Sequence, residues 1–372
     1  MIDPITAAVD TSGMQTLWFL LISVLWIGYF ILEGFDFGVG ILLKKLAKTD
    51  AEKRTVIHTI GPVWDANEVW VLTAGGATFA AFPETYATLF SGFYLALFLI
   101  LFALIARGVS FEFWGKSEDR QWRNRWEWAM LLGSAVPALL WGVAWANIVG
   151  GVPLQEVAGK IEFNGTLLSL LTPYALLGGV VTLLLFVAHG AVFLTLRLKG
   201  ELRERAEDLA ARVGPLAAGA VAVFAIWTIA RQSGDGGIEP LSAIALVAAA
   251  LAAGAANLRV RAAAAQAFAA TAGSIALLFV GLFLELYPNA IVGRGSSPDL
   301  TLAAASSTPY TLKVMTIVTV IFLPIVLAYK SWTYWVFRAR LGAEDFDGVS
   351  NPFDVIAKRR EAAEAAEPQE GA

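Results

Sequence analysis

Apolar residues fall into long runs along this chain, and nine of the runs reach or approach the roughly 20 residues that a helix needs to cross a bilayer. Only 16% of the residues are charged and 57% are apolar, a composition typical of an integral membrane protein. The pattern therefore predicts an all-α membrane protein. Its spans are expected near 16–43, 55–79, 84–106, 129–149, 167–196, 213–231, 241–257, 264–286 and 311–336.

Basic residues are concentrated in alternate connections between these spans. The connections at 44–54, 107–128, 197–212 and 258–261 and the tail from 337 hold 22 of the 27 Lys and Arg residues. By the positive-inside rule they lie in the cytoplasm, so the N-terminus is expected outside and the C-terminus inside. That orientation requires an odd number of spans, which nine satisfies.

The order of the runs predicts one polytopic membrane domain over residues 1–340. Gly-Pro pairs open the spans near 61 and 214, each after a basic connection, which hints at an internal repeat. We expect a four-helix bundle at about 16–149, a second at about 167–286, and a peripheral last helix at about 311–336. Residues 341–372 are polar and predict a solvated cytoplasmic tail.

Four carboxylates interrupt the first two spans. Glu33 and Asp36 lie in EGFDFGVG, and Asp65 and Glu68 lie in GPVWDANEVWVLTAGG. Each pair is spaced i,i+3 and shares a helix face, at a depth of roughly 12 to 20 Å from the basic boundary. An ionised acid facing lipid costs about 2.5 to 3.5 kcal/mol, so these side chains must face protein. Asn67 is expected beside them.

Closely spaced carboxylates in a low dielectric cannot all ionise, and groups that hold and release protons suit a relay. Protons could enter from the cytoplasm near Arg107 and Glu112, which begin the connection after the third span. They would continue through His58, expected two turns from Asp65 on one face, or through Asp65 itself. Alternatively the acids only cap helices or pair with a partner's arginine, and His58 is only interfacial.

The chain has few residues that could bind a haem iron or another redox metal. It has no Cys, two His and four Met, so we expect no haem bound by this chain alone and no metal site. His189 is predicted to be hydrogen-bonded within the bundle. Glycines in the first two spans are predicted to permit close helix packing: Gly34, Gly38, Gly40, Gly75 and Gly76.

Several longer motifs carry a resemblance to a known family. They are MIDP at the start, EGFDFGVGILL (33–43), GPVWDANEVWVLTAGGATFAAFP (61–83), SGFYLALFLIL (91–101), RGVSFEFWGK and QWRNRWEW (within 107–128), GSAVPALLWGVAWANIVGGVP (133–153), LLTPYALLGGV (170–180) and ASSTPYTLKVMTIVTVIFLPIVLAY (305–329). In order and spacing they resemble subunit II of the cytochrome bd family of quinol oxidases, over about two thirds of the chain.

The resemblance implies a heterodimer in the bacterial cytoplasmic membrane. The partner, subunit I, carries a low-spin haem b, a high-spin haem b and haem d, and oxidises quinol near the outer surface. The complex reduces oxygen to water with cytoplasmic protons and is electrogenic without pumping. Subunit II is haem-free in that family, contributes to a proton route, and can hold a structural quinone. Some complexes include a small single-helix accessory subunit.

Matched position by position, Asp65 and Glu112 fall on the family's proposed proton-route carboxylates. Many members have Asp where this chain has Glu112. Asp36 and Arg107 also align, as structural or route-lining groups. Some members have His where Val63 stands here, so one relay group is absent.

Two other functions fit the same residues. A self-sufficient proton-coupled transporter would also use acids near the membrane midplane, but it is expected to have broken helices around them. A purely structural subunit would keep the acids as inert partner contacts. We favour the oxidase subunit, because its motifs cover most of the chain.

Overall fold

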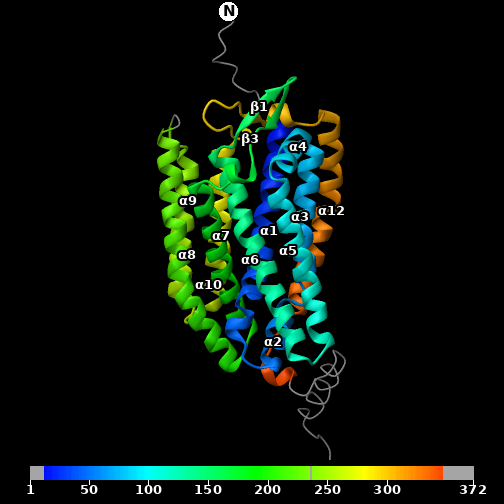
Figure 1. Cartoon of the computed structure of the whole chain (residues 1–372), viewed down its shortest axis with the longest axis vertical. Helices are drawn as coiled ribbons and strands as arrows, with labels where there is room; N and C mark the ends of the chain where they lie inside the picture. The colour runs from blue at the N-terminus through cyan, green and yellow to red at the C-terminus, as the bar shows by residue number, and fades with distance from the viewer. Residues whose placement is uncertain (1–11, 235–236, 347–372) are drawn as a thin grey trace, which may run out of the picture.

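The computed structural model describes residues 12–234 and 237–346, which form an elongated bundle of helices (Figure 1). Within these residues, eight helices are long and apolar enough to cross a membrane. They are α1 (Gly13–Leu46), α5 (Tyr94–Phe113), α6 (Arg120–Gly150), α7 (Pro173–Arg197), α8 (Gly200–Gly234), α9 (Pro240–Arg259), α10 (Ala264–Leu286) and α12 (Pro309–Val336). The chain is a multi-pass membrane protein, as the apolar runs predict.

The second predicted span, 55–79, is two helices rather than one. α2 (Asp50–Ile60) ends before a turn at residues 61–63, and α3 (Trp64–Ala81) follows beside α1. Pro62 explains the break, because it has no N–H to donate to the preceding turn and its ring crowds that turn. The expectation that His58 and Asp65 share one continuous helix face is therefore wrong.

The third predicted span, 84–106, is also divided. α4 (Pro83–Gly92) and α5 meet at Phe93. At one end of the bundle α4 packs against β2 (Lys160–Phe163) and α11 (Leu302–Ala305). The crossing segment is α5, which continues through a short 3-10 turn, η1 (Trp114–Lys116), to residue 116. Arg107 consequently lies inside this helix and not at the start of a connection.

Several helices begin with the same local signal. Thr172, Glu239 and Thr308 precede a proline that opens α7, α9 and α12, respectively, and each side chain accepts a hydrogen bond from a backbone N–H of the first turn. Proline suits the first helical position because that N–H has no intrahelical partner. These sharp starts fix where each span enters the bundle.

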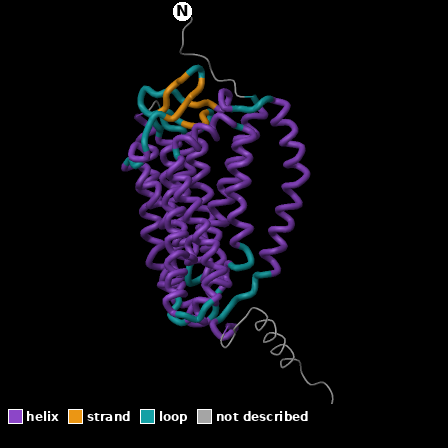
Figure 2. The backbone as a smooth tube through the Cα atoms, turned by 45° about the vertical axis from the view of Figure 1, so that its right-hand side comes forward, coloured by secondary structure: helices purple, strands orange, loops and turns teal. Residues whose placement is uncertain are grey.

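The two ends of the bundle differ in structure. One end, the hairpin end, carries all the described strands (Figure 2). There β1 (Leu154–Val157) pairs with β2 (Lys160–Phe163), and β3 (Asn289–Ile291) pairs with β4 (Leu300–Thr301), both antiparallel. The short elements η2 (Leu167–Leu170) and α11 (Leu302–Ala305) lie beside them. The opposite end, the basic end, carries α2, η1 and η3 (Ala343–Phe346).

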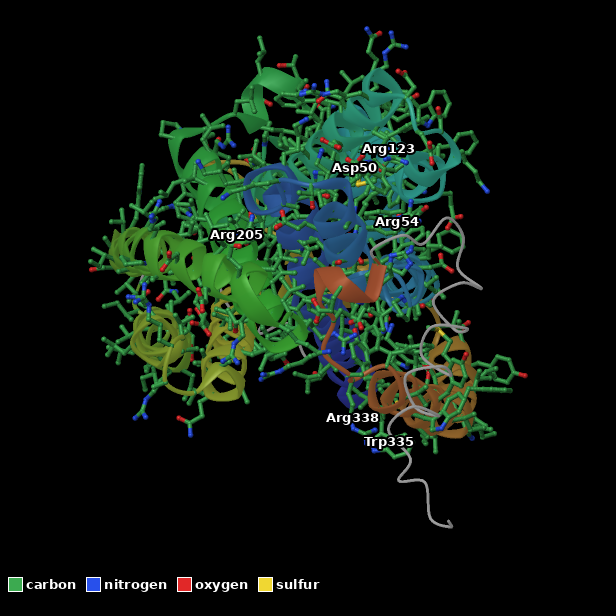
Figure 3. All side chains as sticks on the ribbon, turned by 90° about the horizontal axis from the view of Figure 1, so that it is seen from below. Asp50, Arg54, Arg123, Arg205, Trp335 and Arg338 are labelled. Atoms are coloured by element: carbon green, nitrogen blue, oxygen red, sulfur yellow. The ribbon has the colours of Figure 1, made fainter. Side chains whose placement is uncertain are left out.

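Ion pairs tie the segments of the basic end together (Figure 3). Arg123 at the start of α6 donates to Asp50 of α2 at 2.5 Å, and Arg205 of α8 pairs with Glu52 of α2. Glu127 of α6 forms two further ion pairs, with Lys44 of α1 and Lys53 of α2. These ion pairs therefore anchor α2 to two spanning helices, α6 and α8.

α1 lies at the centre of the bundle and packs against α3, α6, α7 and α10. Aromatic rings fill the core around it, and the Phe30 ring stacks on Phe279 of α10 with 4.1 Å between centroids. α12 is peripheral and packs mainly along α1 and α3, with only Leu312 and Lys330 buried along its length. Trp18 of α1 attaches the first turns of α12, because its indole N–H donates to the Leu312 carbonyl at 3.1 Å.

The glycines of α1 allow close helix packing, as predicted, but those of α3 do not. A methyl group added to Gly38 would lie 2.8 Å from the Cα of Gly190 on α7, so the two backbones are in contact. Phe186 packs on Gly34 in the same interface. Gly75 and Gly76, in contrast, face open space with nothing within 4 Å.

The first residues of the predicted tail belong to the bundle. Leu341 is buried and pairs with Leu198, and Phe346 is buried against the His58 ring with 4.5 Å between centroids. The expectation of a solvated tail from residue 341 is wrong for residues 341–346, because these two large apolar side chains find a site at the basic end. The rest of the tail, 347–372, and the opening motif MIDP lie outside the described residues.

Candidate functional site

A buried ion pair joins α5 to α1 in the half of the bundle nearer the basic end. Arg107 of α5 donates through Nη1 to Glu33 of α1, and both side chains are wholly inaccessible to solvent. The same Nη1 lies 3.5 Å from Oε2 of Glu68 on α3. The guanidinium also lies 4.9 Å from the ring centroid of Phe37. One cation thus connects acids from both predicted carboxylate pairs.

A second polar chain starts from Asp36, one turn from Glu33. Asn67 of α3 donates through Nδ2 to Oδ2 of Asp36 at 2.7 Å. Tyr334 of α12 donates its hydroxyl to Oδ1 of Asn67 at 2.9 Å. The amide of Asn67 is therefore oriented from both sides and links α1, α3 and α12.

We call these residues together the buried charge layer. It consists of Glu33, Asp36, Asn67, Glu68, Arg107 and Tyr334, with Lys330 beside them on α12. The sequence analysis predicted that Glu33, Asp36, Glu68 and Asn67 meet, and it placed Arg107 at the start of a connection instead. It missed the two from α12, although a lysine inside an apolar span is as costly as an acid there and could have signalled the site.

Asp65 lies at the edge of this layer. It occupies the first turn of α3, where a helix N-terminus stabilises a negative charge, and its side chain is exposed on the surface of the isolated chain. Trp64 beside it packs against Phe111 of α5, with 5.1 Å between ring centroids. Asp65 thus lies at the chain surface beside the buried layer.

An apolar groove of about 1000 Å³ begins at Asp65 and Glu68 and runs toward the hairpin end between α3 and α5. The open space at Gly75 and Gly76 belongs to it. The buried hydroxyl of Thr85 also lines it, without a hydrogen-bond partner in the described part of the chain. Large apolar side chains make up most of the lining, among them Leu72, Phe79, Phe93, Phe98, Leu101 and Trp145.

His58 and Glu112 lie apart from the charge layer. The Nδ1 of His58 is 2.9 Å from the Arg54 carbonyl, and its ring packs against Phe346 of η3. Glu112 is exposed in the last turn of α5, near the basic end. The structure therefore brings five of the eight predicted residues together in two contacting groups, Arg107 with Glu33 and Glu68 and Asn67 with Asp36. Asp65, His58 and Glu112 lie around them.

His189 is held inside the bundle by both ring nitrogens. Its Nε2 lies 3.1 Å from the Ile31 carbonyl, which can only accept, so Nε2 carries the proton and Nδ1 accepts from the Thr271 hydroxyl at 2.6 Å. Neither nitrogen is left for a metal. In residues 12–234 and 237–346, no three His, Cys, Asp or Glu side chains are grouped as metal ligands.

The fold and this site define a polytopic membrane protein with a layer of buried charges in its first helices. The sequence profile of the cytochrome bd terminal oxidase subunit II family matches residues 14–337, and the chain belongs to that family. It is therefore a component of a bacterial respiratory oxidoreductase complex that includes a partner subunit I.

Curated relatives and a solved structure agree with this assignment. The chain is 38% identical to cytochrome bd ubiquinol oxidase subunit 2 of Bacillus subtilis, over 90% of this chain and 98% of the relative. It is 33% identical to cytochrome bd-I ubiquinol oxidase subunit 2 of Escherichia coli, over 91% and 98%. A chain of the bd oxidase from Geobacillus thermodenitrificans has the same fold, with a TM-score of 0.72, 17% identity, and coverage of 88% of this chain and 99% of that one.

Proposed function

We propose that this chain is the haem-free subunit II of a quinol oxidase that reduces oxygen to water, and that it carries part of the cytoplasmic proton route. The observation that carries this proposal is the buried charge layer, which reaches the chain surface at Asp65. In this proposal the basic end faces the cytoplasm, since 21 of the 27 basic residues, not counting the buried Arg107 of α5, lie in segments assigned to that side.

Within the route, protons enter at Glu112 near the basic end and pass to Asp65 at the start of α3. Asp36 and Glu33 continue the route inward, and Arg107 balances their charge. Asn67 orients the Asp36 carboxylate, and Glu68 joins the layer through Arg107. His58 is a peripheral group at the entrance, held against Arg54 and Phe346.

The exposure of Asp65 also indicates which surface of this chain subunit I covers. A carboxylate facing lipid near the middle of a membrane is costly, so the α3 surface needs a protein cover. We assign this surface, with the adjoining faces of α5 and α12, to the haem-bearing subunit I. A small accessory helix, if present, would bind elsewhere on the lipid-facing surface.

The haems of the complex do not fit this chain. Both nitrogens of His189 are engaged within the bundle, and the His58 ring lies against Phe346 and the Arg54 carbonyl. His189 therefore offers no axial position for iron, and the His58 ring lies at the basic end, apart from the charge layer. The low-spin haem b, the high-spin haem b and haem d are therefore assigned to the partner, together with quinol oxidation and oxygen reduction.

A structural quinone does fit the apolar groove. The groove has the apolar lining that an isoprenoid tail requires, and the Thr85 hydroxyl can donate a hydrogen bond to a quinone carbonyl. Such a quinone would fill space between α3 and α5 and stabilise their packing. It needs no redox role there.

The test is the turnover of the purified two-subunit oxidase carrying Asp65→Asn or Glu112→Gln. We expect both variants to assemble with their haems and to oxidise quinol more slowly, because each loses a proton-carrying carboxylate. Glu118→Gln, in the neighbouring exposed loop, is the matched control and should keep normal turnover. Normal turnover in both route variants would instead support an inert structural subunit.

The turn at residues 61–63 bears on the transporter alternative. The apolar runs predict continuous helices around the acids, which argues against transport, whereas the structure has a helix break just before Asp65. Family membership still favours the oxidase subunit. Proton-coupled uptake by vesicles that contain this chain without its partner would overturn that choice.

A further inference from the structure

α12 carries a lysine into the buried charge layer. Lys330 lies six residues before the end of α12 and is only 9% exposed. Its Nζ has no hydrogen-bond partner among the described residues, and it lies 5.9 Å from the ring centroid of Tyr334, one turn further along. A buried ammonium without a partner is costly, so its position needs an explanation.

The surroundings of Lys330 are acidic. Lys330 lies beside Tyr334, whose hydroxyl donates to Asn67. Asn67 in turn donates to Asp36 and follows Asp65 by two residues on α3. Oδ1 of Asp36 and Oε2 of Glu33 are also buried without a hydrogen-bond partner in the described part of the chain. Buried polar atoms that have no protein partner are the usual sites of ordered water.

Lys330 is not needed to attach α12 to the bundle, because other contacts hold this helix. Trp18 binds its first turns, and Tyr334 binds Asn67 near its end. Just beyond α12, Leu341 exchanges backbone hydrogen bonds with residues 197 and 199. Lys330 adds no hydrogen bond to this attachment.

We propose that Lys330 is a positioning residue of the proton route, a flexible cation that links surface Asp65 to buried Asp36 across a hydrated gap. Its four-carbon stem lets the ammonium approach either carboxylate, and its charge stabilises whichever one has lost its proton. A proton that leaves Asp65 for Asp36 is then followed by the ammonium moving toward Asp65. This assignment rests on the proposed function.

The test uses the complete oxidase with Lys330→Met and Lys330→Arg, and with Lys313→Met as the control on an exposed position of the same helix. We expect the Lys330→Met oxidase to keep its haem content and its KM for quinol. Its kcat should fall about 10-fold, the lower end of the 10- to 100-fold loss that is typical when an outer-shell partner of a functional group is removed. Lys330→Arg should recover most of kcat, since it restores the charge. Lys313→Met should behave as the unmodified enzyme.

Infrared difference spectroscopy gives a readout that does not depend on turnover. Without the cation, the neighbouring acids hold protons more readily. Lys330→Met should therefore change the stretching bands of protonated carboxyl groups, and the change should be absent in Lys330→Arg. A residue that only fills space would leave these bands unaltered in both variants.

Two results would overturn the role of Lys330. One is normal kcat in Lys330→Met, and the other is an equal loss of kcat and haem in both the Met and Arg variants, which would indicate a packing role. If Asp65→Asn is slow while Lys330→Met is normal, only the lysine assignment fails. If both are normal, the proton route itself fails.

The double variant Asp65→Asn with Lys330→Met tests the link directly. Two residues that act in one step have non-additive effects, so the double variant should be no slower than Asp65→Asn alone. Multiplied losses would place Lys330 in a separate process and refute the link.

Discussion

Arg107 on α5 donates to Glu33 on α1, and neither side chain has any contact with solvent. A buried ion pair costs much desolvation energy and contributes little net stability compared with apolar packing. Arg107 and Glu33 nevertheless depend on each other, because either charge alone would be buried without a compensating charge. The pair therefore fixes the position of α5 against α1.

Arg107→Met should destabilise the bundle strongly. Removing one partner of a buried pair costs about 3 to 5 kcal/mol, and here it leaves Glu33 and Glu68 without their cation. We expect little assembled oxidase in membranes, measured by haem absorbance per amount of tagged chain. The double variant Arg107→Met with Glu33→Gln should assemble better than Arg107→Met alone, since it removes the uncompensated charge. Equal assembly of the single variant and the unmodified chain would contradict this account.

Tyr334→Phe should weaken the oriented contact between Asn67 and Asp36. The hydroxyl fixes Oδ1 of Asn67, so its loss frees the amide to turn away from the carboxylate. The lost hydrogen bond is worth about 0.5 to 1.5 kcal/mol, so assembly should persist while quinol oxidase turnover falls. Tyr329→Phe, at an exposed position on α12, is the control and should have no effect. A turnover equal to that of the control would show that the amide is held without Tyr334.

Hydropathy placed most helices correctly because membrane spans must satisfy their backbone groups internally, so long apolar runs have few other solutions. The breaks at residues 61–63 and at Phe93 were missed, although Pro62 is a helix-breaking residue. An apolar run does not reveal such a break by itself. The apolar run misplaces Arg107 for the same reason, because the run ends before this charged residue although the helix continues through it.

The charge layer was predictable only in part. Helical spacing pairs Glu33 with Asp36 and Asp65 with Glu68, because these relations are local. Tyr334 is 267 residues from its partner Asn67, and no local pattern connects them. The packing of α12 beside α3 is a tertiary contact, and the local pattern of one sequence does not predict it.

Gly38→Ala should disturb the crossing of α1 and α7. The added methyl group would lie 2.8 Å from Gly190 and still closer to the Phe186 carbonyl, both of which are backbone and cannot move aside cheaply. We expect a lower Tm of the purified oxidase. Gly75→Ala introduces the same group into α3, where nothing lies within 4 Å, and should leave the Tm unchanged or slightly higher. Equal Tm values for the two variants would argue against close contact of the backbones.

Gly76→Leu and Thr85→Val should reduce the quinone that co-purifies with the oxidase. The leucine would project into the apolar groove, and the valine removes the hydroxyl proposed to bind a carbonyl. Extraction and chromatography of the bound quinone measure the effect. Gly254→Leu, on α9 with open space around it, and Thr88→Val, whose hydroxyl binds Ile161 instead, are the matched controls. An unchanged quinone content in both groove variants would place the quinone outside the groove.

The Glu52–Arg205 pair predicts a pH dependence of stability at the basic end. Burial raises the pKa of Glu52, but the hydrogen bonds from Arg205 and from the backbone N–H groups of Lys48 and Thr49 outweigh it, so the net shift is downward from 4.5. A carboxylate with a lowered folded pKa contributes its full stability above the unfolded value and loses it as the pH falls through the folded value.

Glu52→Gln should therefore lower the Tm of the oxidase at pH 7 and have progressively less effect below about pH 4.5, where the unmodified carboxylate also becomes protonated. Thermal unfolding of the two proteins from pH 7 to the acid limit of the complex measures the difference. Glu201→Gln is the control, because this carboxylate approaches the same Arg205 at 3.6 Å but is 73% exposed, where an ion pair contributes little. A Tm difference that stays constant with pH would mean that Glu52 acts through its shape and hydrogen-bonding geometry and not through its charge.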